Sequence, residues 1–185
     1  FLWYGLTKGS NLLVYAGTKG DPLTGMPDYM AVEWVKYFLL NNADWDGTTL
    51  AFTEFESLFN QSVEQYYYLF ETSDTDLSGF RDHGGKLIMT HGLADHMIPP
   101  QGTIKYYDLM QETMGGAGAT SKFARLFLFP GLDHSLNGPG AKPVDVLGAL
   151  MLWVKKGKAP KYLDAQVKDE SGKVIRKKSV FPYKN

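Results

Sequence analysis

Two short apolar runs constrain the fold of this chain most strongly, because turn residues bound them and a loop and a helical pattern follow each. They are "GGKLIMTHG" at residues 84–92 and "ARLFLF" at residues 124–129. Such runs are typical of strands buried on both faces of a parallel sheet. Apolar residues at helical spacing predict one helix over 102–114 and another from about 144 to Gly157. This order predicts an α/β fold with right-handed crossovers.

The residues before position 84 have a helical pattern. A helix is expected to open at Pro27 and Asp28. The sequence "TEFE" at residues 53–56 matches a capping box, Ser/Thr-x-x-Glu, and predicts a second helix to about Phe70. Its expected buried face is Phe55, Phe59, Tyr66 and Phe70. Near the other end, residues 170–173 predict the turn of a hairpin within a basic, solvated tail.

Composition excludes several functional classes. The 185 residues, 44% of them hydrophobic, suit one domain or the larger part of one. A net charge of −1 argues against nucleic acid as a partner, and no apolar run approaches the ~20 residues of a membrane span. The absence of cysteine excludes disulfides, thiolate catalysis and cysteine–zinc sites. Because the chain starts at Phe1, we expect a fragment, a processed subunit or the ordered remainder of a longer protein.

An acid and a histidine follow the two predicted strands. Asp95 comes just after the first strand, and His134 comes just after the second, in "FPGLDHSLNGPG". Loops at the carboxyl ends of adjacent parallel strands share one crevice, so the two side chains are expected to meet there. An Asp–His pair of this kind forms two thirds of a hydrolase triad, in which the acid orients the imidazole. The alternative is a surface aspartate and a loop histidine with no joint role.

Other residues near these loops compete for the same roles. Asp133 adjoins His134 but is expected to point away from it in an extended loop, and His96 adjoins Asp95. His91 ends the first strand, where we expect it to bond to the backbone. His83 lies in a charged segment and is expected to be exposed.

The nucleophile is the missing member of this triad. An α/β-hydrolase carries its serine in G-x-S-x-G or a close variant, at a turn from strand to helix. Ser10 has no such pattern, Ser57 and Ser62 lie within the predicted second helix, and Ser78 is expected in a loop before the strand. The chain order in that fold is serine, acid, histidine. The serine is therefore expected upstream of Phe1.

Three stretches together resemble the tannase and feruloyl esterase family. They are "DLSGFRDHGGKLIMTHGLADHMIPPQGTIKYY", "RLFLFPGLDHSLNGPGA" and "ALMLWVKKGKAP", and "LWYGLTKGS" near the start is similar to the end of that family's lid. The resemblance implies the C-terminal part of an α/β-hydrolase with an inserted lid. It implies the C-terminal part of the lid and its return to the core over residues 1–83, the catalytic core with the acid and histidine loops over 84–160 and a C-terminal tail over 161–185.

The same resemblance implies a function. The activity would be hydrolysis of phenolic-acid esters, such as feruloyl or galloyl esters, with Asp95 as the acid, His134 as the base and Ile98 facing the acyl pocket. The partners would be a small aromatic ester and an N-terminal segment or subunit that carries the serine. Without that segment the chain is expected to be inactive. The alternative is an incomplete fragment or a non-enzymatic module that binds aromatic ligands.

The sequence departs from the family pattern in its cysteines. Relatives carry a cysteine after the catalytic histidine, bonded to one beside the serine, whereas Ser135 stands at that position here. A second expected cysteine, near "SVFPY", is replaced by Phe181. The resemblance also implies secretion or a periplasmic location. It implies no cofactor or metal in this chain, with a structural calcium in the part of the lid that the chain lacks.

Overall fold

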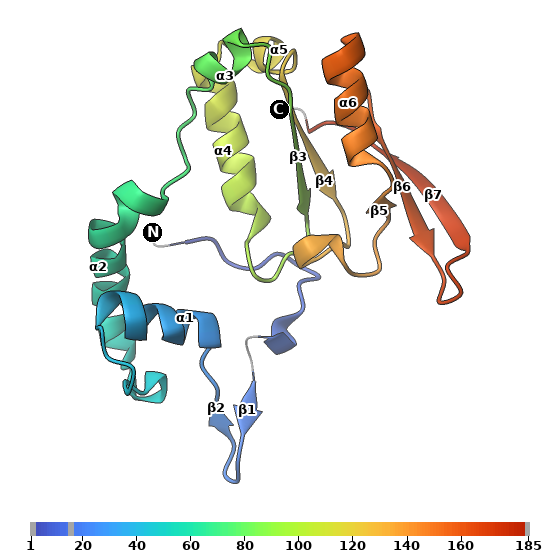
Figure 1. The fold of residues 1–185 in the computed structure, drawn as a ribbon. Helices are drawn as coiled ribbons and strands as arrows, with labels where there is room; N and C mark the ends of the chain where they lie inside the picture. The colour runs from blue at the N-terminus through green and yellow to red at the C-terminus, as the bar shows by residue number, and fades with distance from the viewer. Residues whose placement is uncertain (1–2, 15–16, 184–185) are drawn as a thin grey trace. The chain divides into compact units, whose positions relative to one another are not determined.

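The computed structural model describes residues 3–14 and 17–183, and its contacts divide the chain into two compact units (Figure 1). The first unit includes Leu12–Thr72, and the second includes Trp3–Asn11 and the residues from Ser73 onward. The expected boundary between lid and core, at residues 83 and 84, lies within the second unit. The assignment of 1–83 to a lid stays a prediction.

The first unit is mainly helical. Helix α1 opens as predicted, because Asp28 Oδ1 accepts hydrogen bonds from the backbone N–H groups of Met30 and Ala31 at 3.0 and 3.1 Å. The elements, in chain order, are η1 (Leu12–Val14), β1 (Thr18–Lys19), β2 (Thr24–Gly25), α1 (Tyr29–Trp34), the π-helical turn η2 (Val35–Leu39), η3 (Gly47–Thr49) and α2 (Phe52–Phe70).

Helix α2 begins earlier than its predicted capping box. The backbone N–H of Ala51 donates to Glu54 Oε2 at 2.9 Å, so the carboxylate that reaches back belongs to Glu54 rather than to Glu56. Thr53 lies inside the helix. The predicted box at 53–56 was therefore wrong by two residues, because Ala51 takes the cap position although it has no side-chain acceptor.

The expected buried face of α2 was wrong in part. Phe59 and Tyr66 are half-buried, whereas Phe55 and Phe70 are 48% and 59% exposed. In the part of the chain that the structure describes, no residue of α2 is buried. The aromatic residues of this face cluster around Trp34. The Trp34 ring packs edge-on against the Tyr66 ring, with the two ring centroids 5.0 Å apart.

The second unit contains the predicted parallel strands (Figure 1). Strands β3 and β4 pair in parallel from Leu87 opposite Ala124 to Gly92 opposite Phe129, which confirms the α/β pattern. The elements are α3 (Ser78–Asp82), β3 (Leu87–Gly92), α4 (Pro100–Thr113), α5 (Ala117–Thr120), β4 (Ala124–Phe129), η4 (His134–Leu136), β5 (Lys142–Pro143), α6 (Val146–Lys156), β6 (Leu163–Lys168) and β7 (Val174–Val180).

Alternate residues of β4 face two separate apolar clusters, as the two-residue period of a strand requires. Leu126 packs with Tyr107 and Met110 of α4 on one face. Phe127 and Phe129 pack on the other face, with residues of α6, β6 and the loop after β4. The β3–β4 pair is thus covered by α4 on one side and α6 on the other, and its two following loops leave at the same end.

One edge of β3 is open. The run at 84–92 was expected to be buried on both faces, but its residues 87–91 are only half-buried, while β4 has the predicted burial. The reason is that, across residues 3–14 and 17–183, β3 pairs with β4 alone. A central parallel strand would have a partner on each side.

Helix α6 has the predicted ends but an exposed apolar row. Asp145 Oδ1 accepts from the Gly148 N–H at 2.8 Å, and Gly157 ends the helix with φ 65°. The residues that marked this helix in the sequence are 45–68% exposed: Val144, Leu147, Met151 and Val154. Its buried side is formed by Trp153, which is 2% exposed.

The last residues are more than a solvated tail. The predicted hairpin is confirmed, because β6 and β7 pair antiparallel on either side of residues 169–173. Leu163 and Ala165 of β6 are buried in the cluster around Phe127, so the prediction of a wholly solvated surface was wrong. Among the described residues, no helix is long and apolar enough to cross a membrane.

Candidate active site

The structure brings Asp95 and His134 together. Asp95 lies in the loop after β3, and His134 opens η4 in the loop after β4. His134 Nδ1 lies 3.2 Å from Asp95 Oδ2, within hydrogen-bonding distance. The Asp95 side chain is 7% exposed, while the His134 side chain is 36% exposed. A buried acid that holds a more open imidazole by Nδ1 leaves Nε2 to act on a ligand.

The Asp95 carboxylate is held by the backbone of its own loop. Its Oδ1 accepts hydrogen bonds from the N–H groups of Met97 and Ile98, each at 2.9 Å. Burial raises the pKa of Asp95, but the hydrogen bonds from Ile98, Met97 and His134 together outweigh it and hold the pKa below its ordinary value. The acid therefore stays ionised when His134 needs it as a partner.

The loop after β3 carries Asp95 and is called the acid loop here, and the loop after β4 carries His134 and is called the histidine loop. A close approach of their two backbones sets the distance between them. The Ala94 N–H donates to the Leu132 carbonyl at 2.8 Å. At Gly92, a Cβ atom would lie 2.4 Å from the Leu132 oxygen and 2.6 Å from the Asp133 oxygen. Only glycine permits this contact, so Gly92 is part of the geometry of the pair.

The histidine loop closes on itself through its backbone. The Gly140 N–H donates to the Gly131 carbonyl at 3.0 Å. Inside the loop, Ser135 and Leu136 both adopt left-handed φ values, 59° and 57°, which costs energy for residues with a side chain. Ser135 is exposed, while Leu136 packs against the cluster around Phe127. The half-buried Leu136 side chain supports the strained turn that presents His134.

The competing residues take other positions. His91 bonds to the backbone, as expected, with Nε2 2.9 Å from the Ile98 oxygen. His83 is exposed, and its Nδ1 lies 2.7 Å from the Gly79 oxygen. Asp133 Oδ1 is buried with no hydrogen-bond partner in the described ranges, and His134 is paired with Asp95 instead.

No serine takes the nucleophile's place among the hydrogen bonds of the described residues. The Ser10 hydroxyl donates to the Asp95 backbone oxygen at 3.5 Å, not to His134. Ser57 and Ser62 lie in α2 as expected, whereas Ser78 begins helix α3 rather than lying in a loop. The same ranges contain no group of three His, Asp or Glu side chains placed to hold a metal ion.

Comparison with known proteins identifies the family. The family model "Tannase and feruloyl esterase" matches residues 26–185. The chain belongs to the tannase and feruloyl esterase family. A probable feruloyl esterase of Arthroderma benhamiae is 38% identical over 176 residues, which is 92% of this chain and 33% of that protein. The mono(2-hydroxyethyl) terephthalate hydrolase of Piscinibacter sakaiensis is 38% identical over 122 residues, or 66% of this chain and 19% of that protein.

A solved structure of this family shares the fold. The crystal structure of feruloyl esterase B from Aspergillus oryzae matches with a TM-score of 0.77 at 26% identity, over 86% of this chain and 34% of that one. The predicted α/β-hydrolase fold is thereby confirmed. The chain spans about a third of the length of these feruloyl esterases.

Sequence reasoning missed the backbone donors of the acid loop in this esterase-family chain. The N–H groups of Met97 and Ile98 follow Asp95 by two and three residues, which is the spacing of an Asx turn. Aspartate before a helix that begins with Pro100 could have indicated this turn. The role of Gly92 gave no signal in the sequence, because its neighbour is forty residues away.

The depressed pKa of Asp95 predicts how stability depends on pH. A group whose folded pKa lies below its unfolded value stabilises the fold above the unfolded pKa and loses this effect as pH falls through the folded one. We expect the free energy of unfolding of the wild type to fall below about pH 4. Urea unfolding of both proteins from pH 7 to 3 measures the difference in the free energy of unfolding between the wild type and Asp95→Asn. This difference should shrink as the pH falls. A constant difference would contradict the ionised, hydrogen-bonded acid.

Proposed function

We propose that this chain supplies the acid and the base of a serine carboxylic ester hydrolase that acts on phenolic-acid esters. The observation that carries the proposal is the contact of 3.2 Å between the buried Asp95 carboxylate and His134 Nδ1. Family membership supports the reaction class, and the similarity to feruloyl esterases supports feruloyl or related aromatic esters.

The geometry suits one assignment of catalytic roles to Asp95 and His134. Asp95 accepts a hydrogen bond from the Nδ1–H of His134, which keeps the proton on Nδ1 and leaves the Nε2 lone pair available. Nε2 would take the proton of a serine hydroxyl as it attacks the ester carbonyl, and would give that proton to the departing alcohol. A water molecule would then be activated in the same way to release the acid product. The negative carboxylate stabilises the imidazolium that forms in each step.

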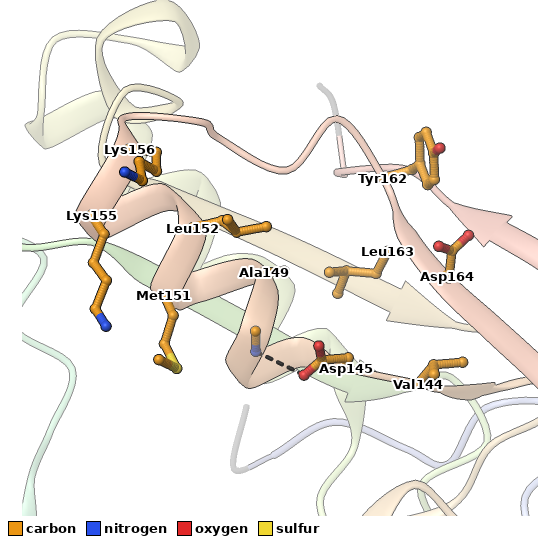
Figure 2. Close-up of a pocket in the computed structure, with 11 residues that line it drawn as sticks. Val144, Asp145, Ala149, Met151, Leu152, Lys155, Lys156, Tyr162, Leu163 and Asp164 are labelled. Carbon is orange, nitrogen blue, oxygen red and sulfur yellow. Dashed lines mark hydrogen bonds between the residues drawn. The ribbon is translucent and has the colours of Figure 1, made fainter.

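The serine would come from a segment upstream of this chain or from a separate subunit. One support is coverage, because the chain spans about a third of its relatives. A second is the edge of β3 that has no strand partner within the described ranges, which a further parallel strand would complete. A third is a groove of about 540 Å³ between α6 and β6, lined by Met151, Leu152 and Leu163 (Figure 2). A missing part of the hydrolase would cover the exposed side chains of Met151 and Leu152.

Further assignments belong to the same proposal. Residues 1–83 would end the lid and return to the core, and residues 84–160 would form the catalytic core. Ile98, which is 50% exposed, would contribute to the acyl pocket. A calcium ion would belong to a part of the lid outside this chain, and the protein would act outside the cytoplasm.

Labelling with a fluorophosphonate tests where the nucleophile lies. The isolated chain is expected to show no labelling and no hydrolysis of methyl ferulate, whereas a protein that adds the upstream segment should show both. Ser10→Ala in the longer protein is the matched control and should leave labelling unchanged. Strong labelling of the isolated chain would contradict the proposal. If Ser10→Ala in the isolated chain then abolished this labelling, the nucleophile would be Ser10.

A second function has one observation in its favour. The first unit holds an apolar pocket of about 320 Å³, with Trp34, Phe55 and Phe59 in its lining, which could bind an aromatic ligand without catalysis. Replacement of His134 by alanine in the longer protein separates the two functions. Hydrolysis that survives this change would show that His134 is not the base, and would favour a binding role for this chain over its proposed part in catalysis.

A further inference from the structure

A second imidazole touches the carboxylate that serves His134. His91, the fifth residue of β3, places Nε2 3.2 Å from Asp95 Oδ2. The same oxygen lies 3.2 Å from His134 Nδ1. The His91 side chain is 11% exposed, against 36% for His134. His91 is therefore shielded, and any effect on a ligand must pass through Asp95.

The hydrogen bonds of His91 define where its proton sits. Nε2 lies 2.9 Å from the Ile98 carbonyl oxygen, and a carbonyl can only accept, so Nε2 carries the hydrogen. Nδ1 lies 2.8 Å from Thr103 Oγ1, so in the neutral ring the threonine hydroxyl donates to it. The ring is held at both nitrogens, by the acid loop on one side and by the first turn of α4 on the other.

The donors around Asp95 match the capacity of its carboxylate. An ionised carboxylate offers about four lone-pair sites over two oxygens. Oδ1 receives the N–H groups of Met97 and Ile98, while Oδ2 lies 3.2 Å from both His134 Nδ1 and His91 Nε2. The hydrogen bond of His91 Nε2–H goes to the Ile98 carbonyl, and it ties the acid loop to β3 directly beside Oδ2. Without His91, the acid loop would lose this tie to β3, and Oδ2 would lose the polar group beside it.

We infer that His91 is a positioning residue: its Nε2–H, fixed by Thr103 at the other ring nitrogen, holds the Ile98 carbonyl of the acid loop and so keeps the adjacent Asp95 carboxylate in the orientation that serves His134. The catalytic meaning of this role rests on the proposed esterase function. Its structural content concerns only Asp95 and the two imidazoles, so it can be tested on this chain without a nucleophile or a substrate.

The test is nuclear magnetic resonance of the chain with ¹⁵N-labelled histidine and ¹³C-labelled aspartate. In the wild type we expect His91 as the Nε2–H tautomer and His134 as the Nδ1–H tautomer. His91→Phe keeps a ring but has no donor, so the His134 tautomers should become mixed and the pKa of Asp95 should rise as its carboxylate loses its fixed position. His91→Gln offers an amide N–H near the position of Nε2 and should restore most of the wild-type spectrum.

Two further variants keep the inference testable if His91→Phe does not fold. Thr103→Val removes the hydroxyl at Nδ1 and should mix the His91 tautomers and weaken the His134 preference. The matched control is Thr113→Val, which removes the hydroxyl that donates to the Leu109 carbonyl at the other end of α4. It should change the tautomers of neither His91 nor His134. A folded His91→Phe, or a Thr103→Val, with wild-type His134 and Asp95 signals would overturn the inference. Failure of ester hydrolysis in the longer protein would contradict the proposed function. It would not affect the NMR result, which reports on Asp95 and the two imidazoles alone.

Discussion

Gly92→Ala is expected to lower the free energy of unfolding by about 3 kcal/mol and to separate the acid from the histidine. The new Cβ would lie 2.4 Å from the Leu132 oxygen and 2.6 Å from the Asp133 oxygen. Both are backbone atoms, so no side chain can turn aside. The loop after β4 must move away, and it carries His134 with it. Urea unfolding would measure the stability, and the loss of the His134 Nδ1–H tautomer would report the separation.

Gly118→Ala is the matched control for this change. Gly118 lies in α5, and nothing lies within 4 Å of the position where its Cβ would be. The substitution should be neutral or stabilise the chain by up to about 1 kcal/mol, because alanine favours a helix. Equal unfolding midpoints for Gly92→Ala and the wild type would contradict the prediction. They would show that the loops after β3 and β4 can separate without a loss of stability.

Asp95→Asn is expected to lower kcat for methyl ferulate by about 10⁴ in a longer protein that joins this chain to the proposed serine segment. The amide oxygen would accept the N–H groups of Met97 and Ile98, because these donors need an acceptor. The amide NH₂ would then replace Oδ2 and donate to His134 Nδ1. This arrangement fixes the proton on Nε2 of His134, where a base needs a lone pair.

The control for that loss is Asp133→Asn. Asp133 adjoins His134 in the sequence and was the competing acid, but the ion-pair contact of His134 is with Asp95. Steady-state kinetics should show kcat within about twofold of the wild type for Asp133→Asn. A large loss in this variant together with a small loss in Asp95→Asn would reverse the assignment of the acid.

The strands and helices of the second unit were predictable, because their signals are local. Continuous apolar runs indicated β3 and β4, and helical spacing with a terminal glycine indicated α4 and α6. The burial of β3 was not predictable, since it depends on a neighbouring strand that the sequence of β3 does not specify. For the same reason, the aromatic face of α2 could be identified from its period while its exposure could not.

The contact between Asp95 and His134 was predictable from one rule of topology, that loops after adjacent parallel strands meet. The rule needs only the order of the strands and the positions of the two residues. The remaining details depend on contacts far apart in the sequence. The approach of Gly92 to Leu132 and the shared use of Asp95 by His91 require the register of β3 on β4, which no local pattern encodes.

The acid loop holds Asp95 with main-chain atoms, and this leaves the side chains of the loop open to evolutionary change. Met97 and Ile98 each contribute an N–H to the carboxylate, and Ile98 contributes a carbonyl to His91, while the Ile98 side chain is half exposed. Every amino acid except proline can supply these backbone groups. Descendants of such a protein can therefore vary the surface next to the acid one residue at a time, with the carboxylate still held in place at each step.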